Sequence, residues 1–150
     1  MNAVDTNVLI YARDPRDPEK QAVAVSLLAS LTDGVLLWQV ACEYIAAARK
    51  LVPLGFDLNQ VWADIADMRQ AWTPITPTWR VMDRAERLMA SYKLSSWDAM
   101  IVAPCLEGGV TRLYSEDFDN SAAAIGLEVV NPFGPQVLSP EETNEHNFNR

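Results

Sequence analysis

Four acidic residues lie at widely separated positions in apolar or strand-like segments of this chain. Asp5 ends the opening segment MNAVD, Glu43 lies within VACEYIAAARKL, Asp98 begins DAMIVA, and Asp117 follows RLYSE. Removing a carboxylate from water costs several kcal/mol unless the group is paired or binds a metal ion. The four residues therefore predict one shared site for a hard divalent cation with oxygen ligands.

Three of these residues also have structural interpretations to be weighed against a metal site. Asp5 could start a helix or a turn, and Asp98 could interact favourably with the dipole of the helix that it begins. Glu43 is harder to explain in this way, because residues 39, 40, 46 and 47 at helical spacing are Gln, Val, Ala and Ala. None of these neighbours offers a positive charge on the same face.

The fourth acid has neighbours of the same charge, and two hydroxyl groups lie beside the acidic positions. Asp117 has two acidic neighbours, Glu116 and Asp119, and composition does not decide which of the three belongs to the site. Thr6 and Ser115 are expected to orient a carboxylate or a water molecule without binding the metal themselves.

Two tryptophans flank the predicted site, and a single histidine lies far from it in the sequence. Trp38 and Trp97 are expected to pack in the core, with stacking of a nucleic-acid base on an exposed edge as the alternative. His146 lies in the polar C-terminal segment and is not expected to be a ligand.

Short strands that alternate with helices are predicted to position these residues. The expected strands are 1–5, 35–38, 113–114 and 127–130, with 73–78 as a strand or loop, and the expected helices are 18–31, 39–52, 58–72, 79–92 and 96–107. The helix over 58–72 is expected to begin with a capping box of Asp57 and Gln60. Alternation of this kind predicts an α/β fold with a parallel sheet, which binds ligands at the carboxyl ends of its strands.

Composition indicates one globular domain. The chain has 150 residues, 49% of them hydrophobic, and no apolar run reaches the roughly 18 residues that cross a bilayer. The opening lacks a basic region and a cleavable apolar stretch, so we expect a cytoplasmic protein without a membrane span.

Cys42 and Cys105 are expected to be buried free thiols. The net charge of −8 argues against non-specific polyanion binding, unless bound metal or a basic partner offsets it.

Four ordered segments resemble the motifs of PIN domains, and most closely those of the VapC toxins of bacterial toxin–antitoxin pairs. They are VDTNVLIYA at 4–12, VACEYIAAARKL at 40–51, SSWDAMIVA at 95–103 and LYSEDFDN at 113–120. The resemblance runs from about residue 2 to Phe133, and VVNPF resembles the family's last strand. It implies a three-layer α/β/α domain over 1–133 with a central, mostly parallel sheet, followed by a polar tail over 134–150.

The resemblance implies a ribonuclease with carboxylate-bound Mg²⁺ or Mn²⁺. Asp5, Glu43, Asp98 and Asp117 match its four acidic positions, which selects Asp117 over its acidic neighbours. A divalent ion lowers the pKa of bound water and neutralises charge on the phosphate. We expect Asp5, Asp98 and Asp117 to bind the metal, and Glu43 to act through water or to orient the nucleophile. Pro104 departs from the family pattern, since a proline inside a helix is expected to kink it.

The resemblance further implies an RNA-cleaving toxin that forms a homodimer and binds a basic antitoxin protein. The alternatives are a housekeeping PIN nuclease and an inactive PIN-like module for protein contacts, and the presence of all four acids argues against the second. A phosphotransfer enzyme of the haloacid-dehalogenase type needs DxDx(T/V), but Asn7 stands two residues after Asp5. The absence of GxxxxGK(S/T) and GxGxxG excludes common kinases and NTPases.

Overall fold

The computed structural model describes residues 1–118 and 125–135. The strands are β1 Asn2–Val4, β2 Gly34–Leu37, β3 Thr73–Ile75, β4 Arg112–Tyr114 and β5 Glu128–Val130. The α-helices are α1 Thr6–Tyr11, α2 Pro18–Ser30, α3 Trp38–Ala47, α4 Asn59–Ala71, α5 Trp79–Tyr92 and α6 Ser96–Glu107, and a 3₁₀ helix, η1, covers Ala48–Leu54.

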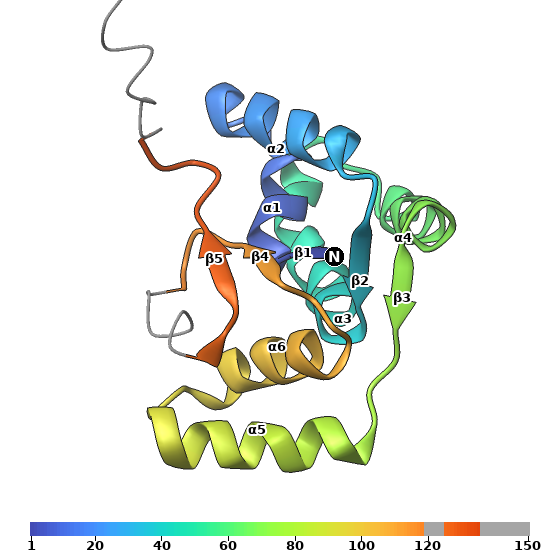
Figure 1. Ribbon diagram of the computed structural model, residues 1–150. Helices are drawn as coiled ribbons and strands as arrows, with labels where there is room; N and C mark the ends of the chain where they lie inside the picture. The colour runs from blue at the N-terminus through green and yellow to red at the C-terminus, as the bar shows by residue number, and fades with distance from the viewer. Residues whose placement is uncertain (119–124, 136–150) are drawn as a thin grey trace, which may run out of the picture.

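The five strands form one parallel sheet in the order β3-β2-β1-β4-β5. The chain steps from β1 to β2 to β3 in one direction and then returns across the sheet to β4. Connections between parallel strands are right-handed. The helices between β1 and β3 therefore cover one face of the sheet, and α5 and α6, which connect β3 to β4, cover the other. Figure 1 shows α2 on one side of the sheet and the α5–α6 pair on the other. The α/β fold expected from the sequence, with three layers, is confirmed.

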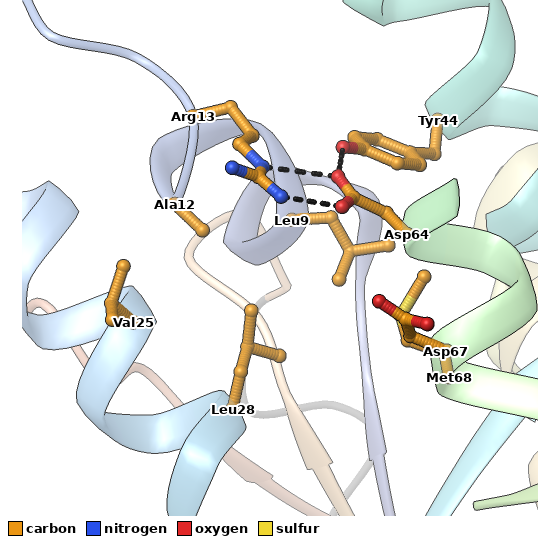
Figure 2. A pocket seen from close by; sticks show the side chains of 9 residues that line it. All are labelled: Leu9, Ala12, Arg13, Val25, Leu28, Tyr44, Asp64, Asp67 and Met68. Atoms are coloured by element: carbon orange, nitrogen blue, oxygen red, sulfur yellow. Dashed lines mark hydrogen bonds and ion pairs between the residues drawn. The ribbon is translucent and has the colours of Figure 1, made fainter. Parts of the chain in front are cut away.

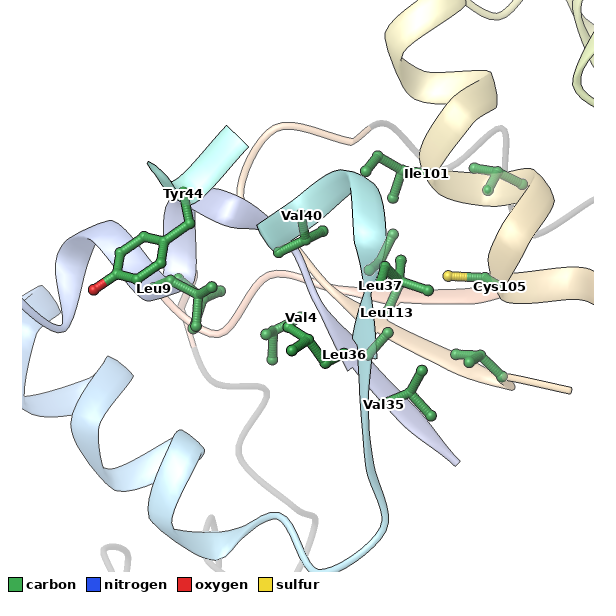
Figure 3. Packing of buried hydrophobic residues seen from close by; sticks show 14 of the residues in the cluster. Val4, Leu9, Val35, Leu36, Leu37, Val40, Tyr44, Ile101, Cys105 and Leu113 are labelled. Atoms are coloured by element: carbon green, nitrogen blue, oxygen red, sulfur yellow. The ribbon is translucent and has the colours of Figure 1, made fainter. Parts of the chain in front are cut away.

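The two faces of the sheet are filled by alternate residues of each strand. Ala3 is in register with Val35 and with Leu113, so these residues share a face. Figure 3 shows Leu113 near Cys105 of α6. Both residues are fully buried in the core, as are Ala3 and Val35. Burial of this kind stabilises a fold by about 25 cal/mol for each Å² of apolar surface removed from water.

The first helix was not expected from the sequence. Asp5 is its N-cap, and its side chain accepts a hydrogen bond from the backbone N–H of Thr6. The helix α1 has only six residues, which is too short for a clear period of apolar residues.

The helix expected over 39–52 is shorter in the structure. The α-helical part ends at Ala47, and the chain continues as η1 through Pro53. A proline lacks the backbone N–H that an α-helix uses and clashes with the preceding turn, so the chain tightens into a 3₁₀ helix here. Gly55 then ends the element in the left-handed region at a φ of 94°, which glycine adopts without strain.

Two local predictions near the other helices were wrong in part. Asp57 accepts a hydrogen bond from the N–H of Asn59, but the Gln60 side chain bonds Asp64 instead of closing a capping box. Cys105 is buried as expected, whereas Cys42 is exposed because it lies on the outer face of α3. Helix α6 runs to Glu107 and so contains Pro104, the position at which a kink was expected.

Residues 136–150 lie outside the described residues, and with them His146 and all but the first two residues of the tail expected over 134–150. The same holds for Asp119. Within the described residues, no helix combines the length and apolarity that a membrane crossing requires.

Candidate active site

The register of two neighbouring strands places Asp5 beside Ser115. Val4 of β1 pairs with Tyr114 of β4, and the backbone N–H of Asp5 donates to the Tyr114 carbonyl at 2.8 Å. The residues after these pairs therefore meet at the carboxyl edge of the sheet. The Ser115 hydroxyl donates to Asp5 Oδ2 at 2.8 Å, while Thr6 N–H donates to Asp5 Oδ1 at 2.7 Å. Asp5 thus combines the helix-start role with the position expected for a catalytic acid.

Glu43 reaches the same edge from α3. Helix α3 begins directly after β2, so its first turns lie above the carboxyl ends of the strands. The Thr6 hydroxyl donates to Glu43 Oε2 at 2.7 Å, and the Gln39 amide donates to Oε1 at 3.0 Å. Both oxygens of Glu43 are therefore held by hydrogen bonds from neutral groups. The expectation that Thr6 orients a carboxylate is consistent with this geometry.

Asp117 and Asp98 approach from the loop after β4 and from the start of α6. The Asn7 amide donates to Asp117 Oδ2 at 3.1 Å and lies 3.4 Å from the Ser115 hydroxyl. Asp98 lies in the first turn of α6, where its backbone N–H donates to the Ser95 hydroxyl at 3.2 Å. Ser95 is thus the N-cap of this helix.

All four acids line one open pocket of about 180 Å³. Its lining consists of Asp5, Thr6, Asn7, Glu43, Trp97, Asp98, Ile101, Asp117 and Phe118. No Lys, Arg or His is part of this lining in the described segments of the chain. The pocket is therefore an uncompensated cluster of negative charge at the carboxyl edge of a parallel sheet, which is where such sheets bind ligands.

The electrostatics of Asp5 reflect this cluster. Burial raises the pKa of Asp5, and the negative charges of Glu43 and Asp117 raise it further. The hydrogen bonds from Ser115 and Thr6 oppose this change because they favour the charged carboxylate. The net result is a raised pKa, so the ionised form of Asp5 is costly unless a cation is close to it.

The donor chemistry of the pocket suits a hard divalent ion. Its polar groups are oxygens of carboxylates, a hydroxyl and an amide, and Asn7 Oδ1 is buried without a hydrogen-bond partner. No three acidic, His or Cys side chains in the described residues are close enough together to form a direct ligand set. Mg²⁺ does not need such a set, since it keeps several waters and uses one or two carboxylates. The residues therefore fit a partly hydrated ion.

A larger pocket of about 290 Å³ lies away from these acids, between α1, α2, α3 and α4. Figure 2 shows its polar centre, where Arg13 and Tyr44 both bond the carboxylate of Asp64. Burial alone would raise the pKa of Asp64, but these two hydrogen bonds lower it overall. The groups satisfy one another, so they are not available as acid, base or metal ligand.

Two features of the site were missed from the sequence, and one expectation was wrong. Asn7 contacts Asp117 across 110 positions of the chain, a relation that no local pattern carries. Glu116 is bonded by Lys20 of α2, which turns it into an ion pair outside the lining of the acidic pocket. The tryptophans expected to pack in the core do not: Trp38 is 57% exposed and lines a separate small pocket with Met100, and Trp97 is 66% exposed.

Comparisons with known proteins identify the family of this chain. A family model for the PIN domain matches residues 3–126. No curated protein matches the chain. The resemblance inferred from four sequence segments is thereby confirmed at the level of the family.

Solved structures with the same fold include toxins of toxin–antitoxin pairs. A toxin–antitoxin complex from Klebsiella pneumoniae has a TM-score of 0.65 at 22% identity, covering 89% of this chain and 98% of that chain. FitAcB from Neisseria gonorrhoeae has a TM-score of 0.62 at 19% identity, with coverages of 89% and 99%. Mycobacterium tuberculosis VapC20, a sarcin–ricin loop cleaving toxin, has a TM-score of 0.59 at 18% identity, with coverages of 85% and 96%.

Proposed function

This chain belongs to the PIN-domain family of metal-dependent nucleases, and we propose that it hydrolyses RNA as the toxin of a toxin–antitoxin pair. The observation that carries the proposal is the acidic pocket, which gathers Asp5, Glu43, Asp98 and Asp117 from four separate segments. Support for the toxin role comes from the solved neighbours, among them a toxin described as cleaving the sarcin–ricin loop.

Each acid has a defined part in the proposed reaction. Asp5, Asp98 and Asp117 would hold the ion, which we take to be Mg²⁺ or Mn²⁺, with one or two of these carboxylates bound directly and the rest through its water molecules. When bound, such an ion supplies an acidified water and neutralises charge on the phosphate oxygens. Glu43, fixed by Thr6 and by Gln39, accepts a hydrogen bond from the attacking water and so orients it towards the phosphorus atom.

The chain's own hydrogen bonds prepare this site. Ser115 and the N–H of Thr6 keep Asp5 in one rotamer, and Asn7 holds Asp117 towards the pocket. Groups held in place before the substrate arrives cost no reorganisation during the reaction. The buried Ser115 hydroxyl therefore acts by positioning a carboxylate, as does Thr6.

The nuclease proposal is tested with purified protein and a labelled single-stranded RNA. Cleavage is expected with Mg²⁺ or Mn²⁺ and none in EDTA. Asp98→Asn and Asp117→Asn should each lower kcat/KM by on the order of 100-fold or more. Even the loss of a residue that only hydrogen-bonds to a metal ligand commonly lowers metal affinity or activity by about 10- to 100-fold. Cleavage that persists in EDTA would contradict the metal mechanism.

Glu116→Gln is the matched control for Asp117→Asn, since the two acids are adjacent. The Glu116 carboxylate is bonded by Lys20 and does not line the acidic pocket. Its variant should therefore retain activity within a few-fold of the wild type. Equal losses in both variants would mean that the loop, rather than the Asp117 carboxylate, is what the reaction needs.

The biological proposal is that the protein is cytoplasmic, forms a homodimer and is inhibited by an antitoxin with a basic segment. A basic side chain that enters the acidic pocket would pair with its uncompensated carboxylates. Expression in bacteria should arrest growth, and Asp5→Ala should relieve the arrest. Normal growth with high levels of active nuclease would favour a housekeeping enzyme instead. Light scattering that shows only monomer at micromolar concentration would contradict the proposed homodimer.

A further inference from the structure

One aromatic side chain of the acidic pocket has no part in the chemistry described so far. Trp97 is the second residue of α6, lines the pocket and is 66% exposed. Four tryptophans in this chain are exposed, so exposure alone does not mark a site. Its position does: it is the one tryptophan that lines the pocket of the four acids.

The charge of the pocket raises the question of how RNA is held there. Phosphates are normally bound by Lys and Arg, but the described lining contains neither. Lys20, which lies beside the loop of Asp117, is already paired with Glu116. The whole chain carries a net charge of −8, which repels a polyanion. Within the described lining, contacts to RNA beyond the metal–phosphate contact are therefore limited to groups that do not depend on positive charge.

Aromatic stacking is such a source. Every base has a π-face, and stacking on an exposed aromatic side chain contributes to single-strand binding without a sequence requirement. We propose that Trp97 is a substrate-positioning residue that stacks on an unpaired base next to the phosphodiester bond cut in the acidic pocket. The proposal rests on the ribonuclease function and names its substrate class: single-stranded or looped RNA, since a base inside a duplex is already stacked on both faces.

The local structure makes Trp97 a suitable platform. It precedes Asp98 directly in the chain, and Ser95 caps the helix by accepting from the Asp98 N–H. Ala99 and Ile101 anchor the same turns in the core, with exposed fractions of 0% and 3%. The backbone positions that carry the indole and the Asp98 carboxylate thus belong to one anchored helix start, which keeps a base stacked on Trp97 close to the Asp98 carboxylate.

The test compares three variants of the full chain on a single-stranded oligoribonucleotide and on its duplex. Trp97→Ala should lower kcat/KM by about 5- to 150-fold, the usual effect of losing one stacked base. Trp97→Phe should retain most of the activity. Trp79→Ala is the matched control, because Trp79 is exposed at 81% in the first turn of α5 and does not line the pocket. It should behave as the wild type, and the duplex should be cut poorly by every variant.

An abasic substrate separates stacking from a structural role. If the base beside the cut is removed, wild type should lose the same factor as Trp97→Ala does on intact RNA, and Trp97→Ala should lose nothing more. If Trp97→Ala were slower than the wild type by the same factor on the abasic substrate as on intact RNA, the proposal would be overturned. So would a kcat/KM for Trp97→Ala that equals that of the wild type on intact single-stranded RNA.

Binding in EDTA keeps this inference distinguishable from the nuclease proposal. Fluorescence anisotropy of a labelled single-stranded oligoribonucleotide should show a weaker Kd for Trp97→Ala than for the wild type. Wild-type protein that binds in a Trp97-dependent way but does not cut RNA would reject the nuclease function and retain the stacking contact. A Kd that does not depend on residue 97, together with unchanged cleavage, would refute the stacking contact alone.

Discussion

Asp5→Asn is expected to inactivate the protein while making the metal-free fold more stable. The side chain is 8% exposed, and burial together with the charges of Glu43 and Asp117 raises its pKa. The variant removes this unfavourable charge with almost no change of shape. Asn is as good an N-cap as Asp, and the Ser115 hydroxyl can accept from the new amide instead of donating. Both hydrogen bonds of the native side chain therefore have replacements.

The contribution of the Asp5 hydrogen bonds to stability can be estimated by comparing Asp5→Asn with Asp5→Ala, because the alanine variant removes the same charge together with the hydrogen bonds. The lost cap costs about 1 kcal/mol, and the buried Ser115 hydroxyl left without its acceptor costs about 1–3 kcal/mol. The alanine variant should therefore be about 2–4 kcal/mol less stable than the asparagine variant. For a chain of this size 1 kcal/mol shifts Tm by about 2–4 °C, so the two Tm values should differ by about 4–16 °C.

The pH dependence has a definite sign. A carboxyl group with a raised pKa in the folded state contributes stability below its unfolded value of 3.8, and this is lost as pH rises through the folded pKa. The advantage of Asp5→Asn over the wild type should therefore be absent at low pH and grow above 3.8. The difference in Tm between Asp5→Asn and the wild type is measured by thermal unfolding in EDTA from pH 3 to 8, followed by circular dichroism.

Metal addition is the second arm of the same experiment. Mg²⁺ should raise the Tm of the wild type, because a ligand that binds only the folded state stabilises it, and it should raise that of Asp5→Asn much less. A metal-free Tm of Asp5→Asn at pH 7 below that of the wild type would refute the electrostatic reasoning. An equal rise with Mg²⁺ in both proteins would show that Asp5 does not bind the ion.

Two further predictions concern stability away from the acidic pocket. Asp64→Ala leaves the buried Tyr44 hydroxyl without its acceptor and Arg13 without its partner, and should cost about 1–3 kcal/mol at pH 7 in chemical unfolding. Since the pKa of Asp64 is lowered in the fold, this cost should shrink as pH falls below 3.8, and a cost independent of pH would contradict the assignment. Gly34→Val should also destabilise by about 1–3 kcal/mol, because a Cβ there would lie 2.5 Å from the buried ring of Trp72. The urea midpoint should fall at constant m-value, and an unchanged midpoint would mean that the ring moves without cost.

Much of the architecture followed from local pattern. The helices expected over 79–92 and 96–107 have the bounds of α5 and α6. Where a pattern was too short, as in α1, or where a proline changed the helix type, as at Pro53, the prediction failed. Periodicity reports only which face of a regular element is apolar, and it needs several turns to do so.

The sequence by itself determined the candidate acids, since charged residues in apolar segments at strand ends are visible without coordinates. Only the tertiary structure decided how they are held. Ser115 hydrogen-bonds to Asp5 across 110 positions of the chain, and Thr6 hydrogen-bonds to Glu43 across 37. Glu116 forms an ion pair with Lys20, whereas Asp117 lines the pocket. These contacts arise from the register of parallel strands and from helices that cross between them, so residues far apart in the chain meet at a single edge of the sheet.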